Sequence, residues 1–393
     1  MFEISDPYFV SVLLFFAILG IVIYRDRSNM EFHTVMVMRR TEKFRGFIDR
    51  VASVSPGFWK AFATLGILLA AVMGSYMLYI LLFTARSIFL GIIKEPALQL
   101  VLPNPSSSIS TGPGYFLLPF WFWIVAIGAI LVPHEMMHGI VARAEKIRLR
   151  SVGLLLLVIF PGAFVEPDER QLQKAGLLTR LRVFAAGSLA NFSMAALLYC
   201  LLAYAAFPAL SGTGLILDNV TAGSPAALAG LHSGMLVTAV NNIPITSTYH
   251  EYATGRGYLS DEVGVLHAGE NVTFTAGGKD YAMAAVNNTE TGLPYIGINY
   301  TPVMKVPYDA FNMVAYLMAM VLQFSLAVGM VNILPIYPLD GGLMFEAVMK
   351  RYVKGRRAQT IVRVVTYFLV LILLFDFLGP WILNLLGPFL KVL

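Results

Sequence analysis

Long apolar stretches alternate with short polar segments along most of the chain. A helix that crosses a hydrocarbon core of about 30 Å needs roughly 20 apolar residues. Stretches of that length occur at residues 8–24, 58–83, 115–141, 183–206, 310–334 and 361–386. The pattern predicts a polytopic α-helical membrane protein with about six transmembrane helices.

Basic residues are concentrated in alternate loops between these stretches. Their positions are Arg39, Arg40, Lys43, Arg45 and Arg50, then Lys146, Arg148 and Arg150, then Lys350, Arg351, Lys354, Arg356 and Arg357. Cytoplasmic loops carry an excess of Lys and Arg, so these loops are expected on the cytoplasmic side. The connections 85–114 and 211–308 carry few basic residues, which predicts that they and both termini are extracytoplasmic. A prokaryotic plasma membrane, an archaeal one included, is the expected location.

Three segments depart from the pattern of long apolar helices. Residues 151–167 are apolar but short and rich in Gly and Pro, which favours a membrane-embedded β-hairpin or re-entrant segment. Residues 171–181 interleave basic residues with leucines, as in a helix that lies in the cytoplasmic interface. Residues 211–300 contain short alternating segments between turn residues, which predicts a small soluble α+β domain outside the membrane.

The soluble segment carries a more specific order of signals. Gly223 and Pro225 are expected to start a short helix, and Gly230 to end it. Asn241 and Asn242 are expected to turn a hairpin. This order resembles the helix-turn-strand core of PDZ domains, which bind peptides or carboxyl termini.

These features divide the chain into five expected segments. They are an N-terminal two-span region with a cytoplasmic basic loop (1–114), a first half of a membrane core (115–208), the PDZ-like domain (211–300), a second half of the core (308–345), and a basic loop with a C-terminal span (346–393).

Composition supports the membrane interpretation and argues against a nucleic-acid-binding surface and against cysteine-based cross-links or metal sites. The chain is 58% hydrophobic and 13% charged, whereas in soluble domains roughly half of the residues are apolar and roughly a quarter are charged. Its net charge of +5 comes with basic residues confined to short loops, which is a topology signal rather than a nucleic-acid surface. Cys200 is the single cysteine, so an intrachain disulfide and a cysteine metal cage are both excluded.

The third apolar stretch contains His134-Glu-Met-Met-His138, an HExxH motif. Residues four apart share one face of a helix, so both imidazoles can reach one zinc ion. Glu135 is placed to act as a general base on water activated by the metal. A chance match in a helix is the alternative, but ionisable groups inside a membrane span are costly without a function or partners.

A catalytic zinc ion usually has three protein ligands, so the motif predicts one more. His33, His232, His250 and His267 all fall in expected soluble segments, whereas Asp340 follows the fifth apolar stretch directly. On the expected topology Asp340 lies at the same depth as the histidines, which makes it the preferred ligand. A carboxylate that ends a span is the alternative reading of Asp340 taken alone.

Two asparagines lie within apolar stretches. Asn332 could hydrogen-bond a substrate backbone or stabilise an oxyanion, and a helix–helix hydrogen bond is equally compatible with the residue alone. Asn191 ends the segment Gly187-Ser-Leu-Ala-Asn191, for which close helix packing with one interhelical hydrogen bond is the preferred reading.

Together these motifs resemble the site-2 protease family of intramembrane metalloproteases, whose members pair HExxH on one span with Asn-x-x-Pro…Asp-Gly on a later one. The matching residues are His134, Glu135, His138, Asn332, Pro335, Asp340 and Gly341. The likeness extends to residues 161–167 and 187–192, where many members have Pro in place of Ser188. It covers about two thirds of the chain, from near Tyr115 to Gly342.

The resemblance implies a zinc metalloendopeptidase with one catalytic Zn²⁺ ion. Its metal ligands would be His134, His138 and Asp340, and Glu135 would be the catalytic acid/base. The implied activity is regulated intramembrane proteolysis of single-span membrane proteins, which a PDZ domain outside the membrane would screen. An unwound substrate would lie along a strand edge, with further contacts to two asparagines. These implied substrate-binding residues are Gly162, Ala163, Phe164, Val165, Asn332 and Asn191.

The expected partners are therefore single-span substrates, a peptide or carboxyl terminus at the PDZ-like domain, and membrane lipid, with no nucleic acid. Two other classes of function remain open. A PDZ-bearing membrane scaffold with a non-catalytic zinc site would have no need for Glu135. A metal-ion transporter would be expected to show inverted repeats with paired broken helices, and the sequence has no such symmetry.

Overall fold

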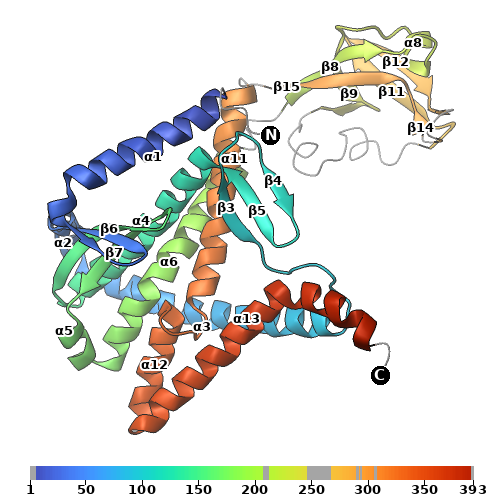
Figure 1. Cartoon of the computed structure of the whole chain (residues 1–393). Helices are drawn as coiled ribbons and strands as arrows, with labels where there is room; N and C mark the ends of the chain where they lie inside the picture. The colour runs from blue at the N-terminus through green and yellow to red at the C-terminus, as the bar shows by residue number, and fades with distance from the viewer. Residues whose placement is uncertain are drawn as a thin grey trace. The chain divides into compact units, whose positions relative to one another are not determined.

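Figure 1 shows a computed structural model of the chain, which describes residues 6–206, 212–245, 267–288, 292, 294–304 and 308–390. The chain divides into two compact units. The helical unit combines Met1–Leu197 with Met320–Leu393, and the small unit is Leu198–Ala319.

Within the described residues, six helices are long and apolar enough to cross a membrane. They are α1 (Pro7–Arg25), α3 (Pro56–Phe89), α4 (Phe120–Ala144), α6 (Leu177–Leu201, continued by the π-helical turn η2, Leu202–Ala206), α11 (Tyr308–Asn332) and α13 (Arg356–Leu390). The predicted polytopic helical membrane protein is therefore confirmed at this level. α6 is the innermost of these helices, since 56% of its apolar window is buried.

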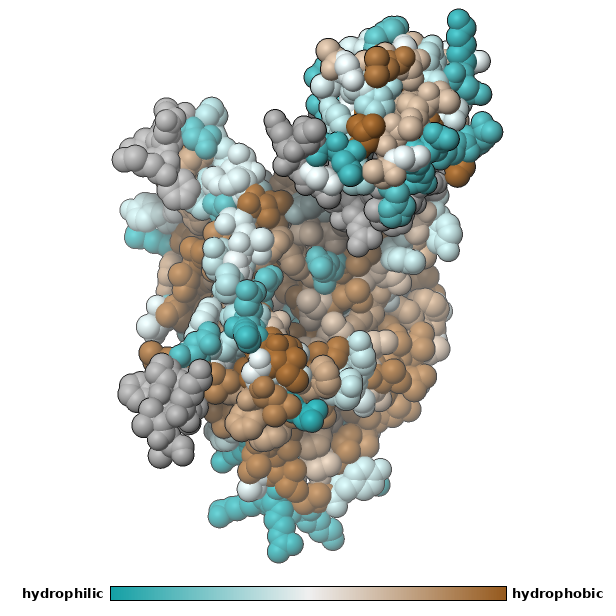
Figure 2. Space-filling view, turned by 90° about the vertical axis from the view of Figure 1, so that its right-hand side faces the viewer, coloured by the Kyte–Doolittle hydropathy of each residue, from teal (hydrophilic) through white to brown (hydrophobic). Residues whose placement is uncertain are grey.

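The outer helices present apolar side chains to the surroundings. Only 6% of the apolar window of α1 and 17% of that of α13 is buried. Figure 2 shows apolar side chains gathered over much of the visible flank of the helical unit. α3 and α13 lie side by side in this unit (Figure 1). Lipid chains are the medium that suits such an apolar surface.

Shorter helices connect the long ones. They are η1 (Arg27–Asn29), α2 (Lys43–Val54), α5 (Glu169–Lys174) and α12 (Asp340–Tyr352). The prediction of a single interfacial helix over residues 171–181 is wrong, because α5 ends at Lys174 and α6 begins at Leu177. Ala175 adopts an extended conformation and is followed by Gly176, a residue that disfavours a continuous helix.

An antiparallel sheet in the helical unit has the order β1-β2-β6-β7. Its strands are β1 (Met30–Phe32), β2 (Met36–Thr41), β6 (Leu149–Leu157) and β7 (Phe160–Pro167). β6 and β7 form an antiparallel pair over the segment expected to be a hairpin, with Leu157 opposite Phe160 at its tight turn, and its membrane-embedded position stays a prediction. β2 pairs with the other side of β6, so β7 is an edge strand.

A second sheet precedes α4 in the chain. It consists of β3 (Leu100–Asn104), β4 (Ser110–Gly112) and β5 (Tyr115–Pro119), with β5 in the middle. The third span therefore begins at Phe120, later than the expected Tyr115. An apolar run without clear periodicity fits a buried strand as well as a helix, and here the pairing of β5 with β3 decides.

The small unit is built from short strands around one core. Among the described residues, β12, β11, β9, β8 and β15 lie in that order, β10 pairs with β9, and β13 pairs with β14. Their bounds are β8 (Gly212–Val220), β9 (Leu236–Val240), β10 (Ile243–Pro244), β11 (Asn271–Ala276), β12 (Lys279–Ala284), β13 (Val286–Asn287), β14 (Pro294–Tyr295) and β15 (Ile298–Met304). Leu215, Val237 and Phe274 are fully buried in this core.

Two local predictions for this unit are confirmed. The short helix α8 (Pro225–Leu228) is N-capped by Ser224, and Gly230 follows it with φ of +96°. Asn241 and Asn242 both have positive φ and join β9 to β10, as a two-residue hairpin turn requires. Of the alternative histidines, His250 lies outside the described residues.

Candidate metal centre

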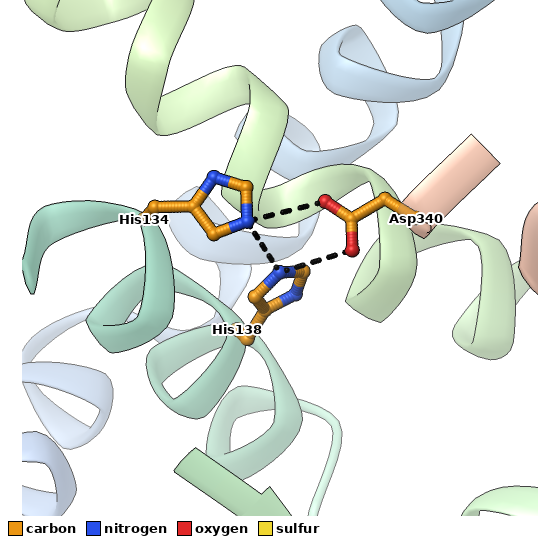
Figure 3. A group of neighbouring side chains, drawn as sticks. All are labelled: His134, His138 and Asp340. Carbon is orange, nitrogen blue, oxygen red and sulfur yellow. Dashed lines mark hydrogen bonds and ion pairs between the residues drawn. The ribbon is translucent and has the colours of Figure 1, made fainter. Parts of the chain in front are cut away.

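α4 places the HExxH residues on one side of the helix. His134 is buried with 5% of its surface exposed, and His138 lies one turn further along the same face. Both side chains point toward a common point beside α6, as Figure 3 shows. The periodicity of a single helix is therefore enough to bring the two imidazoles together.

Asp340 reaches the same point from a distant part of the sequence. α11 ends at Asn332, and a short apolar turn leads to Asp340, the first residue of α12. Two glycines permit this close turn. A Cβ at Gly341 would collide with the carbonyl of Ile333, and one at Gly342 would collide with the backbone of Ile336. The Asp-Gly-Gly sequence thus fixes where the carboxylate lies.

The three side chains form a compact donor set (Figure 3). The Nε2 atoms of His134 and His138 lie 3.3 Å apart, and they lie 3.4 and 3.3 Å from the two carboxylate oxygens of Asp340. Ligands about 2.0–2.1 Å from a tetrahedral zinc ion lie about 3.3–3.4 Å from one another. Two imidazoles and a carboxylate also match the usual donors of a catalytic zinc ion with an open fourth position. The residues therefore fit zinc.

α6 also contacts the donor set, through Gly187 and Ser188. A Cβ at Gly187 would collide with the Nε2 atoms of both histidines, so this position must be glycine for the space to remain. Ser188 donates its hydroxyl hydrogen to Asp340 over 3.4 Å. The sequence predicts close packing with one interhelical hydrogen bond for residues 187–191, but it does not predict these contacts with the donor set. Polar and small residues together inside an apolar span were the available signal.

Glu135 lies beside the donor set and contacts the edge strand β7. The backbone N–H of Val165 donates to the Glu135 carboxylate over 3.2 Å. Gly139 lets α4 and β7 approach closely, because a Cβ there would lie 3.0 Å from Val165 Cγ1. The N–H of Val165 points to α4 and hence away from β6. Gly162, Ala163 and Phe164 precede it on the same half-buried strand.

The two asparagines occupy different positions. Asn191 is buried, with its side-chain amide 3.1 Å from Nδ1 of His134. Asn332 is half-buried at the last residue of α11, before the turn that leads to Asp340. The structure thus brings Glu135 and Asn191 near the donor set, and the functional roles of Glu135, Asn191 and Asn332 stay predictions.

Comparison with known proteins identifies the family. The sequence profile of Peptidase family M50 matches residues 122–375, which is more than half of the chain and includes the whole donor set. The chain belongs to Peptidase family M50. M50 is a family of peptidases that is typically zinc-dependent, and the six long apolar helices of the described residues indicate that this M50 member is a membrane protein.

A relative from Methanocaldococcus jannaschii is similar over a shorter region. An uncharacterized protein of that organism is 26% identical to this M50 member over 184 residues. The aligned region covers 46% of this chain and 47% of the relative. The chain therefore spans about half the length of the curated relative that it matches.

Proposed function

We propose that this M50 member is an intramembrane zinc metalloprotease that cleaves single-span membrane proteins in regulated intramembrane proteolysis. One observation carries the proposal. Three side chains have tetrahedral spacing beside Glu135: His134 and His138 on the apolar helix α4, and Asp340 at the start of α12. A structural metal site has no need of an additional carboxylate that is not part of the donor set.

Zinc bound by these residues would polarise the scissile carbonyl as a Lewis acid and lower the pKa of a nearby water molecule. Glu135 accepts a proton from that water as the water oxygen bonds to the carbonyl carbon. The carbon–nitrogen bond then breaks, and Glu135 returns the proton to the leaving amine nitrogen. The backbone N–H of Val165 orients the Glu135 carboxylate for both transfers.

The edge strand β7 supports a proposal for how the substrate is held. A transmembrane helix hides its peptide bonds, so cleavage requires that it unwind locally. An edge strand offers unpaired backbone groups to which an extended segment can add. We place the substrate along Gly162, Ala163, Phe164 and Val165, with Asn332 available to hydrogen-bond its backbone.

The small unit supports a further part of the proposal. Its antiparallel strands and the short helix α8 agree with the PDZ-like pattern of the sequence. We propose that it lies outside the membrane with both termini, and that it screens substrates by a peptide or carboxyl terminus. The basic loops would then be cytoplasmic, with the metal centre near that face.

The test is cleavage of a panel of single-span reporter proteins by the purified full-length protein in bilayer discs. Cleavage sites are identified by mass spectrometry. The proposal expects cuts within the apolar segment by the wild type and by the exposed-residue control Glu95→Gln, with activity reduced at least about 100-fold in Glu135→Gln. Glu135→Gln that cuts as fast as wild type contradicts the mechanism. A wild type that binds zinc and reporters but cuts none of them supports the scaffold instead, and zinc flux into liposomes supports the transporter.

A further inference from the structure

Each of the three proposed metal ligands has a polar partner on α6. The Nδ1–H of His138 donates to the backbone carbonyl of Val183 over 2.7 Å. Ser188 donates to Asp340, and the amide of Asn191 contacts Nδ1 of His134. A metal ligand whose second polar atom is held by a neighbour keeps its orientation and its proton position. The most buried helix of the unit is therefore the common support of the donor set.

Asn191 is closely packed and is held from a second helix. Only 1% of its surface is exposed, so its amide has no access to bulk water. Ser325 on α11 donates its hydroxyl hydrogen to the backbone carbonyl of Asn191 over 3.0 Å. A Cβ at Gly329 would lie 3.3 Å from the Cβ of Asn191, which shows how closely α11 packs against it. The backbone of Asn191 is thus fixed from a second helix.

An amide can pair with either tautomer of a neutral imidazole, because it has both a hydrogen-bond donor and an acceptor. In the arrangement seen, the Asn191 Nδ2 atom faces His134 Nδ1, so the amide donates and the imidazole proton is on Nε2. Nε2 is the atom that faces the other ligands, and it can bind a metal only without its proton. A half-turn of the amide presents its oxygen to a protonated Nδ1 and leaves the Nε2 lone pair available.

We propose that Asn191 is a positioning residue that holds His134 as an Nε2 metal ligand by accepting a hydrogen bond from its Nδ1–H. This inference rests on the proposed metal site, and it gives Asn191 a role in metal binding rather than in substrate binding. A partner of this kind typically changes metal affinity by about 10- to 100-fold when removed. Removal of a residue that only holds substrate would leave metal affinity unchanged and raise KM.

The first test is zinc affinity of the full-length protein in detergent without substrate, measured by competition with a chelating indicator. Asn191→Leu keeps the branching and the number of heavy atoms of the side chain but has no acceptor, so we expect a dissociation constant about 10- to 100-fold above wild type. Asn191→Asp retains an acceptor and is expected within about threefold of wild type or tighter. Ser193→Ala is the control, because within the described residues the Ser193 hydroxyl bonds only to the carbonyl of Leu189 on its own helix.

The second test needs no substitution at Asn191. In zinc-loaded protein labelled with ¹⁵N-histidine, the His134 ring should show a protonated, hydrogen-bonded Nδ1 and a metal-bound Nε2. A His134 resonance is identified by its absence from His134→Gln.

The outcomes separate this inference from the proposed function. Wild-type zinc affinity in Asn191→Leu, or a His134 ring with Nδ1 on the metal, overturns the role of Asn191 and leaves the protease proposal standing. A wild type that binds no zinc overturns both.

Discussion

The backbone nitrogen of Val165 lies 3.2 Å from the carboxylate of Glu135. This contact joins the proposed acid/base on α4 to the edge strand β7, on which we place the substrate. The same strand would therefore hold the substrate backbone and orient the group that moves the proton. Under this proposal, one peptide unit would couple the position of the substrate to the proton transfer.

Removal of the Val165 N–H should slow catalysis without unfolding the sheet. Val165→Pro deletes this donor, and proline is tolerated at an edge position whose N–H does not point to the neighbouring strand. A hydrogen bond to a charged group contributes about 1.5–3 kcal/mol, so kcat should fall about 10- to 100-fold. The measurement is kcat and KM on a reporter that the wild type cuts.

Ala163→Pro is the matched control for that substitution. Backbone N–H groups alternate in direction along a strand, so the N–H of Ala163 also points away from β6. Unlike the N–H of Val165, it makes no hydrogen bond to Glu135. It should raise KM, because it removes an edge donor, and leave kcat within about threefold of wild type. Equal losses of kcat in the two variants would show that the Val165 contact has no special role.

Gly187 should be essential for metal binding. In Gly187→Ala the new Cβ collides with the Nε2 atoms of His134 and His138, so one imidazole must move. Zinc affinity should fall by more than about tenfold, and cleavage should fall with it. Alanine favours a helix over glycine by about 1 kcal/mol, so loss of folding is not the expected cause.

Gly128→Ala on α4 serves as its control, since no atom lies within 4 Å of a Cβ there. It should bind zinc like wild type and melt at the same or a higher temperature. Metal affinity is measured by chelator competition for both variants. Unchanged zinc affinity in Gly187→Ala would contradict the geometry of the donor set.

Asp168 should make the stability of the protein depend on pH in the acid range. It caps the N-terminus of α5, and the backbone N–H of Gln171, with a smaller effect of Arg150, holds the pKa of its carboxyl below the ordinary 3.8. A lowered folded-state pKa stabilises the fold above the unfolded value of about 3.9, and this contribution is lost as pH falls through the folded value.

Asp168→Asn isolates the charge, because asparagine also caps helices well. We expect the wild type to melt at a higher temperature than the variant near neutral pH, and the difference to shrink as the pH falls below the unfolded pKa and to vanish once it is below the folded pKa. Thermal unfolding followed by circular dichroism in detergent measures it. A difference that grows on acidification would have the wrong sign for this explanation.

Much of the donor set could be predicted from sequence because its geometry is local. One helix brings His134 and His138 together at a spacing of four, and Asp340 follows the end of another apolar stretch, at the same depth on the expected topology. The turn at Asn241 and Asn242 is local in the same way, because both residues tolerate positive φ.

The contacts from α6 could not be predicted because they depend on how helices pack. Nothing in residues 187–191 alone states that Gly187 faces two imidazoles or that Ser188 reaches Asp340. The sheet around β6 shows the same limit. β2 pairs Val37 with Leu156, far along the chain, and such non-local pairing leaves no periodic signal in either strand.

The most direct test of the account is the zinc content of purified full-length protein, combined with X-ray absorption at the zinc edge. The account predicts about one zinc ion per chain in wild type and in Glu135→Gln, bound by two imidazole nitrogens and oxygen at about 2.0–2.1 Å. It predicts loss of that zinc in Asp340→Ala. A wild type that takes up no zinc, or an Asp340→Ala variant that holds it as tightly as wild type, would contradict the metal centre.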